Sequence, residues 1–166
     1  MTSFFSDTYS RNGRRLRGHD YSSPGKYFIT ISTKGRVQYL GKVKDGKMIL
    51  SEAGLLVQEL WHEIPRHYPI AELDEYAVMP DHIHGIIIIS KPCEIMMPKL
   101  CVETPKTHHL GVIINQFKRT STVKAKKIGL ELAWQPRYYD HIIRNRLDLY
   151  CTRQYIIDNP QKYERR

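Results

Sequence analysis

Five segments of this chain have the hydrophobic pattern of strands: residues 27–33 alternate apolar and polar, and the run of β-branched isoleucines at 86–89 favours a strand. The last of these segments contains a turn at Pro136 and is expected to lie at a sheet edge. Two of the segments flank Pro80 and Asp81, so they are expected to form a tight hairpin. The strands are predicted at residues 27–33, 38–43, 73–79, 83–90 and 134–143.

Three other segments carry apolar residues at helical spacing. Ser51 is the expected N-cap of the first helix, which runs to about residue 66. The second covers residues 110–128 and ends at Gly129. The third covers residues 146–159, where Asn159 and Pro160 end it, because a residue before proline is pushed out of the helical region.

The resulting order, β-β-α-β-β-α-β-α, predicts an α+β fold with a mixed sheet layered with helices. The 166 residues suffice for one domain with a real core, and 41% of them are hydrophobic, as in ordinary globular proteins. We expect a flexible basic N-terminal arm over residues 1–24 and one domain over residues 25–166. Residues 91–109 contain three prolines and are expected to form a loop of unassigned role.

The most informative segment is Met79-Pro-Asp-His-Ile-His-Gly, followed by four isoleucines. On a strand, residues two apart point to the same face, so His82 and His84 face one way and Ile83 faces the core. Two imidazoles on one rigid face are half of a metal site. Such a pair is also common as two partly buried polar side chains, so a second motif is needed.

That second motif lies near the other end of the chain. Tyr155 and Asn159 are four residues apart on the last predicted helix, so a phenol and an amide project together. Alternatively, Tyr155 packs in the core and Asn159 only caps the helix. Tyr150 and Gln154 are also four apart, although Tyr150 lies on a different helix face and is expected to pack.

Together these motifs resemble a known family. His82-Ile83-His84 is similar to the HUH motif, and Tyr155-Ile-Ile-Asp-Asn-Pro is similar to the Tyr-Ile-x-x-Asn-Pro signature of single-tyrosine HUH transposases. The REP-associated tyrosine transposases are the most similar branch. The segments Tyr27-Phe-Ile-Thr-Ile, Ala77-Val-Met-Pro-Asp and 134–144 agree, and the resemblance spans residues 26–163.

The resemblance implies a ferredoxin-like, mainly antiparallel sheet with the histidine strand central and the tyrosine helix across it. It also implies that Tyr155 attacks a DNA phosphodiester and forms a covalent phosphotyrosine. His82 and His84 would bind a divalent ion, Mg²⁺ or Mn²⁺, with the Asn159 amide oxygen as a third ligand. Asp81 is adjacent to His82 and could support the ion without binding it directly, although we favour a plain turn role for it after Pro80.

The function implied is a metal-dependent single-strand DNA endonuclease and strand transferase acting on hairpin-containing repeat DNA. The alternative is a domesticated DNA-binding protein of the same fold with little or no cleavage. An unrelated metallohydrolase would need more carboxylates near the histidines than Asp81 alone. Related enzymes work as monomers or as dimers that exchange tyrosine helices, so either a monomer or a homodimer is compatible.

The formal net charge is +9 and the sequence pI is about 9.5, which suits a polyanionic partner such as single-stranded or hairpin DNA. The cations are clustered, as phosphate contacts require. The candidate DNA-binding residues are Arg11, Arg14, Arg15, Arg17, Lys118, Arg119, Lys124 and Arg144.

Three further features bear on location. Cys93, Cys101 and Cys151 are an odd number without metal-type spacing, so we expect reduced thiols in a cytoplasm. The polar N-terminus does not read as a secretory signal. No apolar run approaches the roughly 20 residues that span a bilayer, so we expect no membrane partner. The resemblance to transposases implies a prokaryotic, nucleoid-associated protein.

Overall fold

The structure is a computed structural model that describes residues 23–90 and 110–164. Its centre is a four-stranded sheet in the order β4-β5-β1-β6, and every strand pairs antiparallel with its neighbours. The strands are β1 (Gly25–Ser32), β4 (Ala71–Met79), β5 (His82–Ile89) and β6 (Tyr139–Ile143). The predicted α+β class with a central histidine strand is confirmed.

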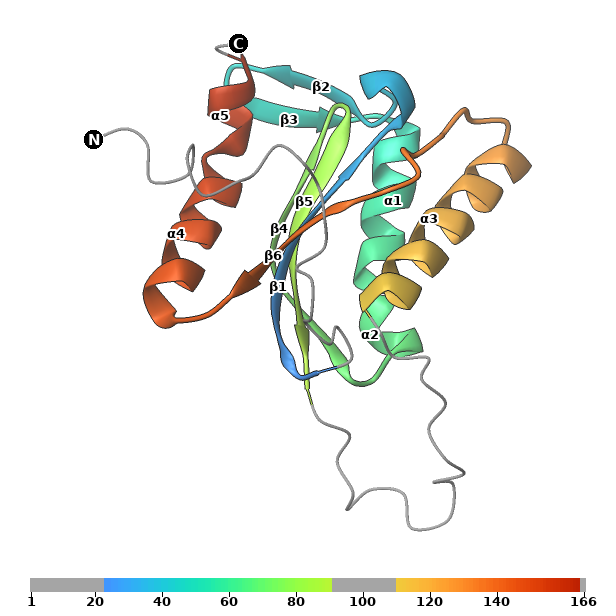
Figure 1. The fold of residues 1–166 in the computed structure, drawn as a ribbon. Helices are drawn as coiled ribbons and strands as arrows, with labels where there is room; N and C mark the ends of the chain where they lie inside the picture. The colour runs from blue at the N-terminus through green and yellow to red at the C-terminus, as the bar shows by residue number, and fades with distance from the viewer. Residues whose placement is uncertain (1–22, 91–109, 165–166) are drawn as a thin grey trace, which may run out of the picture.

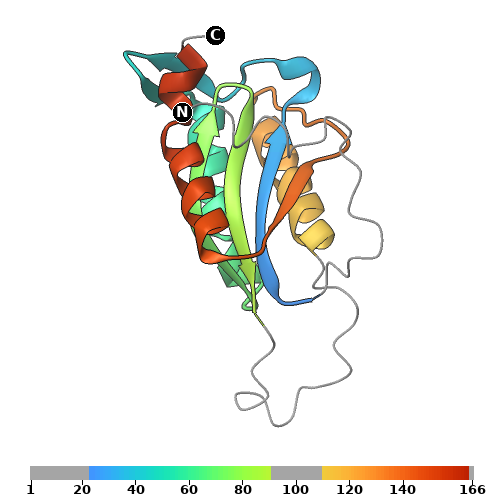
Figure 2. The same ribbon diagram turned by 60° about the vertical axis from the view of Figure 1, so that its left-hand side comes forward.

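Helices cover both faces of the sheet (Figures 1 and 2). On one face lie α1 (Glu52–His62), α2 (Ile64–His67) and α3 (Leu110–Lys127). On the other lie α4 (Arg146–Ile157) and the short α5 (Asn159–Glu164). The order β1-α1-β4-β5-α3-β6 is the βαββαβ order of ferredoxin-like folds, with α4 and α5 added at the end.

The alternation along β5 divides its residues between two cores. Ile83 and Ile87 are fully buried with α1 and α3. Ile86 is buried on the other face with Phe28, Leu149 and Ile156. Gly85 faces the first core, where the ring of Trp61 leaves no space for a side chain: a Cβ there would stand 2.3 Å from Trp61 Cζ2. The sequence prediction that Ile83 faces the core is therefore confirmed.

Prolines explain why one predicted helix and one predicted strand are longer than the observed elements. The helix predicted from Ser51 to residue 66 stops at His62, and α2 follows with Pro65 near its start. Of the strand predicted at residues 134–143, only β6 pairs with β1, while Trp134 forms an isolated bridge with Thr33. Proline has no N–H to donate, so Pro65 and Pro136 each interrupt a hydrogen-bond pattern.

The predicted caps are confirmed: Ser51 accepts from the Gly54 N–H at 3.1 Å, and Gly129 has φ +78° after α3.

The second predicted strand was also incomplete. It is observed as β2 (Gly41–Lys44), paired antiparallel with β3 (Lys47–Leu50), a strand that the sequence did not predict. A short 3-10 helix, η1 (Lys34–Arg36), precedes this two-stranded ribbon. Figure 1 shows the ribbon at the top of the sheet, between α5 and α1.

Two predicted segments lie largely outside the described residues: the basic arm and the 91–109 loop. Among the helices that the structure describes, none combines the length and the apolar character needed to cross a membrane.

Candidate functional site

His82 and His84 lie side by side on β5, on the sheet face that α4 covers. Both are buried, at 4% and 5% exposure. Their rings are 4.4 Å apart between centroids, and the two Nε2 atoms are 2.9 Å apart. The predicted common orientation of the pair is confirmed.

The outer nitrogen of each imidazole is bonded to the protein. His82 Nδ1 lies 2.6 Å from Asp81 Oδ1, so the carboxylate accepts its hydrogen and the Nε2 of a neutral ring carries the lone pair. His84 Nδ1 lies 2.8 Å from Thr30 Oγ1, across the β1–β5 pairing. These contacts fix both ring orientations and bring the two Nε2 atoms within hydrogen-bond distance of each other.

Asp81 does more than form the turn that the sequence reading favoured. The second oxygen of its carboxylate accepts from Arg36 Nε at 2.9 Å, so one buried carboxylate bridges a histidine and an arginine. Burial alone would raise the pKa of Asp81, but the hydrogen bond from His82 and the electrostatic interactions with the His82 ring and Arg36 outweigh it and lower the pKa. Arg36 reaches this position with φ 60°, a left-handed conformation that costs a non-glycine residue about 1–3 kcal/mol.

The histidine pair fits a divalent ion. Two nitrogen ligands at right angles, each with a bond of roughly 2.1 Å, stand about 3 Å apart, and the two Nε2 atoms are separated by 2.9 Å. Within the described residues, no group of three His, Cys, Asp or Glu side chains gathers as a metal site. Any further protein ligand at this pair would therefore be of another type, such as an amide.

Tyr155 lies beside the histidine pair within the same chain. Its ring meets the His84 ring edge-on, 5.3 Å between centroids, and meets the Phe28 ring at 5.9 Å. Phe28 in turn stacks on His84 at 5.4 Å. Close by, burial, the charge of Asp140 and the neighbouring Tyr155 raise the pKa of Tyr139 to about 12. The last predicted helix thus brings its tyrosine to the histidine strand.

Asn159 and Tyr163 continue the same face beyond Tyr155, at four-residue intervals. Asn159 is buried at 7% exposure, and the Tyr163 ring lies 6.1 Å from that of His82. The predicted helix end at Asn159 is two residues late: α4 ends at Ile157, and α5 begins at Asn159 itself. Pro160 cannot donate to the carbonyl of Ile156, yet Asp158 keeps a helical conformation, so the chain turns only slightly.

Tyr163 is held where it faces the Asp81 carboxylate. Gln38 Nε2 donates to its phenolic oxygen at 3.2 Å. Burial and the negative charge of Asp81 raise the pKa of Tyr163, so its proton is retained. Tyrosines from the two helices thus flank the pair, Tyr155 at His84 and Tyr163 at His82.

A bidentate ion pair joins α4 to strand β4 of the same chain. Arg153 donates from Nε and Nη2 to the two oxygens of Asp74, at 2.8 and 2.6 Å. Asp74 lies at the irregularity in β4 between Leu73 and Tyr76, and its side chain is 10% exposed. The hydrogen bond from Arg153 lowers the pKa of Asp74, with burial opposing. This clamp stabilises the position of Tyr155 beside His84.

We expect the substitution Asp74→Asn to lower the free energy of unfolding by about 1–2 kcal/mol at neutral pH, since a partly exposed charged pair is removed. The folded-state pKa of Asp74 is lowered, so the pair's contribution is full above the unfolded pKa of about 4 and is lost as pH falls through the folded pKa. Urea unfolding at about pH 7 and about pH 3 checks this. If the free energies of unfolding of the wild type and Asp74→Asn differ by the same amount at both pH values, the prediction is wrong. The control is Glu131→Gln, which changes an exposed carboxylate.

Tyr150, the competing tyrosine, is 61% exposed, so the expectation that it packs is wrong. Five residues turn a helix by about 500°, which leaves Tyr150 roughly 140° around the helix from Tyr155. The buried positions of α4 are Leu149, Thr152 and Ile156.

The predicted DNA-binding cations do not gather at the histidine pair. Lys118 donates to the carbonyls of Gln135 and Arg137, and its burial lowers its pKa. Lys124 pairs with Glu63 at 3.6 Å. These two residues and Arg119 belong to α3, on the sheet face away from Tyr155, while Arg144 is exposed just before α4. Arg11, Arg14, Arg15 and Arg17 lie outside the described residues.

Sequence reasoning missed Thr30, Arg36 and Tyr163. Thr30 and Arg36 carry no local signal, because they reach the site only through strand register and a left-handed backbone conformation. Tyr163 did carry one: it follows Asn159 by four residues, and reading the helical period past Pro160 would have found it.

Two proteins of Haemophilus influenzae are related to this chain in sequence. An uncharacterized protein of Haemophilus influenzae is 32% identical over 172 residues, covering 98% of this chain and 95% of its own. A second H. influenzae protein, named as a candidate REP-associated tyrosine transposase, is 26% identical over 145 residues, covering 87% of this chain and 74% of its own. No protein-family model matches the chain.

The solved structure of the REP-associated tyrosine transposase bound to a REP hairpin shares the fold, with a TM-score of 0.63 and 22% identity over 90% of this chain and 74% of that one. The fold and the grouped residues define an α+β protein with a histidine pair on the central sheet and a tyrosine helix across it. The chain is thus similar to REP-associated tyrosine transposases, in sequence to the second H. influenzae protein and in fold to the solved structure.

Proposed function

We propose that this protein is a metal-dependent endonuclease and strand transferase that cuts single-stranded DNA beside a hairpin through a covalent bond to Tyr155. The observation that carries the proposal is the contact of the Tyr155 ring with the His84 ring, 5.3 Å between centroids, within one chain. A nucleophile and a candidate metal pair on facing elements are the two parts that phosphodiester cleavage requires.

In the proposed reaction, Tyr155 Oη attacks the phosphorus and the phosphodiester bond to one sugar oxygen breaks. The phenol loses its proton, and the departing sugar oxygen gains one and leaves as a hydroxyl. The phosphotyrosine bond conserves the energy of the broken bond. A second DNA hydroxyl can therefore attack the same phosphorus, which rejoins the strand and returns the proton to Tyr155.

His82, His84 and Asn159 would hold the divalent ion, Mg²⁺ or Mn²⁺. When bound, this ion would act as a Lewis acid on a non-bridging phosphate oxygen. Asn159 is supported as a ligand because it is buried and lies in sequence midway between Tyr155 and Tyr163, the residues that contact His84 and His82. Imidazole ligands favour Mn²⁺ over Mg²⁺, and without an inner carboxylate the affinity for the ion alone would be weak.

Hairpin DNA as the substrate is supported by the related transposase solved with a REP hairpin and by the net charge of +9. Because one chain already brings Tyr155 to His84, a monomer would contain all the proposed catalytic residues. A dimer that exchanges tyrosine helices would need to open the Arg153–Asp74 clamp.

The test is covalent capture. The protein is incubated with a labelled DNA hairpin that carries single-stranded tails, with Mn²⁺, Mg²⁺ or EDTA, and is then denatured. We expect a labelled protein–DNA adduct and a released fragment with either ion, and neither product in EDTA. Tight binding of the hairpin with no adduct under any condition would refute the enzyme and favour a DNA-binding protein of the same fold.

A further inference from the structure

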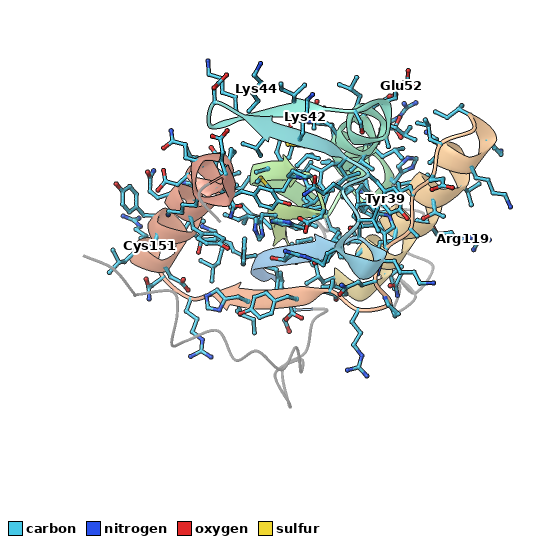
Figure 3. The ribbon with its side chains drawn as sticks, turned by 90° about the horizontal axis from the view of Figure 1, so that it is seen from above. Tyr39, Lys42, Lys44, Glu52, Arg119 and Cys151 are labelled. Carbon is cyan, nitrogen blue, oxygen red and sulfur yellow. The ribbon has the colours of Figure 1, made fainter. Side chains whose placement is uncertain are left out.

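The β2–β3 ribbon presents a positively charged outer face. Its strands alternate between inward residues, which include Val43 and Met48, and exposed ones. Figure 3 shows Lys42 and Lys44 at the outer edge of the molecule, on the ribbon. The exposed residues of the two strands are Lys42, Lys44, Lys47 and Ile49.

These lysines do not stabilise the ribbon. Lys44 stands directly opposite Lys47 in the strand pairing, and like charges in that position repel each other. Among the residues that the structure describes, no acidic side chain forms an ion pair with Lys42, Lys44 or Lys47. The only acid within residues 41–50 is Asp45, in the turn. A surface that keeps unneutralised charges at a cost in stability fits a polyanionic partner.

Both ends of the ribbon are hydrogen-bonded to segments that adjoin the histidine site. At its base, the Leu40 N–H donates to the carbonyl of Pro80, in the turn that precedes His82. At its tip, the Asp45 and Gly46 N–H groups donate to the carboxylate of Glu164 at the end of α5. The same short helix carries Tyr163 beside His82. The position of the lysines is therefore tied to the site.

We propose that the outer face of the β2–β3 ribbon binds the phosphate backbone of the single-stranded DNA that enters the Tyr155 site. The inference rests on the proposed function, because it takes DNA as the substrate. Lys42 and Lys44, about 7 Å apart along one strand, can follow successive phosphates, and Ile49 offers apolar contact to a base or sugar. The ribbon replaces α3 as the main docking surface, since Lys118 already donates to backbone carbonyls and Lys124 already pairs with Glu63.

The experiment compares two charge-matched triple variants. Lys42→Gln/Lys44→Gln/Lys47→Gln removes the ribbon charges, and Arg66→Gln/Lys126→Gln/Lys127→Gln removes three exposed charges from α2 and α3. Each is titrated with the tailed DNA hairpin and with an oligo(dT) strand over a range of salt. If all three lysines contact phosphate, the ribbon variant loses roughly 50-fold in affinity near physiological salt, and its salt slope falls by about 2. The matched variant changes little.

Two further measurements make the outcome decisive. The triple Lys→Arg ribbon variant should bind like the wild type, and thermal unfolding should show that all variants are folded. Equal losses of DNA affinity in the two Gln variants would overturn the inference, as would a ribbon variant whose DNA affinity is unchanged. Binding to anionic phosphatidylserine vesicles that depends on the ribbon lysines, with unchanged DNA affinity, would also overturn it. If the wild type binds DNA and forms the adduct in those cases, the proposed function stands; if the wild type binds no DNA, both fail.

Discussion

Tyr155→Phe is expected to abolish the covalent protein–DNA adduct and to leave the fold and DNA affinity nearly unchanged. The substitution removes only the phenolic oxygen and keeps the ring that packs against Phe28 and His84. Without the nucleophile no phosphotyrosine can form, so cleavage should fall to background, a loss of several orders of magnitude. Adduct formation with the labelled hairpin and DNA affinity by fluorescence anisotropy measure the two effects.

The matched control for this variant is Tyr150→Phe. It makes the same chemical change on the same helix, at a side chain that is 61% exposed. It should form the adduct at the wild-type rate. An adduct that persists in Tyr155→Phe and disappears in Tyr150→Phe would show that Tyr150 is the nucleophile. Loss in Tyr163→Phe alone would assign the nucleophile to the tyrosine beside His82.

His82→Ala and His84→Ala should each reduce cleavage by at least roughly 100-fold, because a metal ion acting as a Lewis acid contributes several kcal/mol. DNA affinity should change much less, since it rests mainly on phosphate contacts away from the pair. Cleavage rates across a Mn²⁺ titration, with and without EDTA, provide the measurement. The variants should need more Mn²⁺ than the wild type for any residual activity.

His67→Ala is the control for the histidine variants, because His67 is exposed on α2, on the other side of the sheet. It should cleave normally at every Mn²⁺ concentration. Thermal unfolding must accompany these measurements, because removing His82 leaves the buried Asp81 carboxylate without one of its two partners. Undiminished cleavage by the wild type in EDTA would rule out the metal mechanism.

Much of this molecule was determined by local patterns in its sequence. Alternation and β-branched residues placed β1, β4 and β5, and helical spacing placed α1, α3 and α4. The two-residue spacing of His82 and His84 determined that both rings share a face, since that follows from strand geometry alone. Likewise, Tyr155 and Asn159 were predicted to share a helical face. Their roles remain proposals.

Interruptions by proline were harder to place from the sequence. A backbone N–H donor is missing at Pro65, Pro136 and Pro160. Whether the helix or strand stopped there depended on the surrounding structure. At Pro160 the chain resumed as α5 and carried Tyr163 to the site, where the sequence reading had ended the helix.

Only the tertiary structure decided which distant residues complete the site. Thr30 meets His84 through strand register, Arg36 reaches Asp81 from η1, and Arg153 clamps α4 to Asp74. It also decided that Lys118 donates to backbone carbonyls, that Lys124 pairs with Glu63, and that the lysines of β2 and β3 share one exposed face. Periodicity reports which side of an element is buried, because burial repeats with the local geometry of the backbone. It carries no information on which elements become neighbours, because that choice depends on the packing of the whole chain.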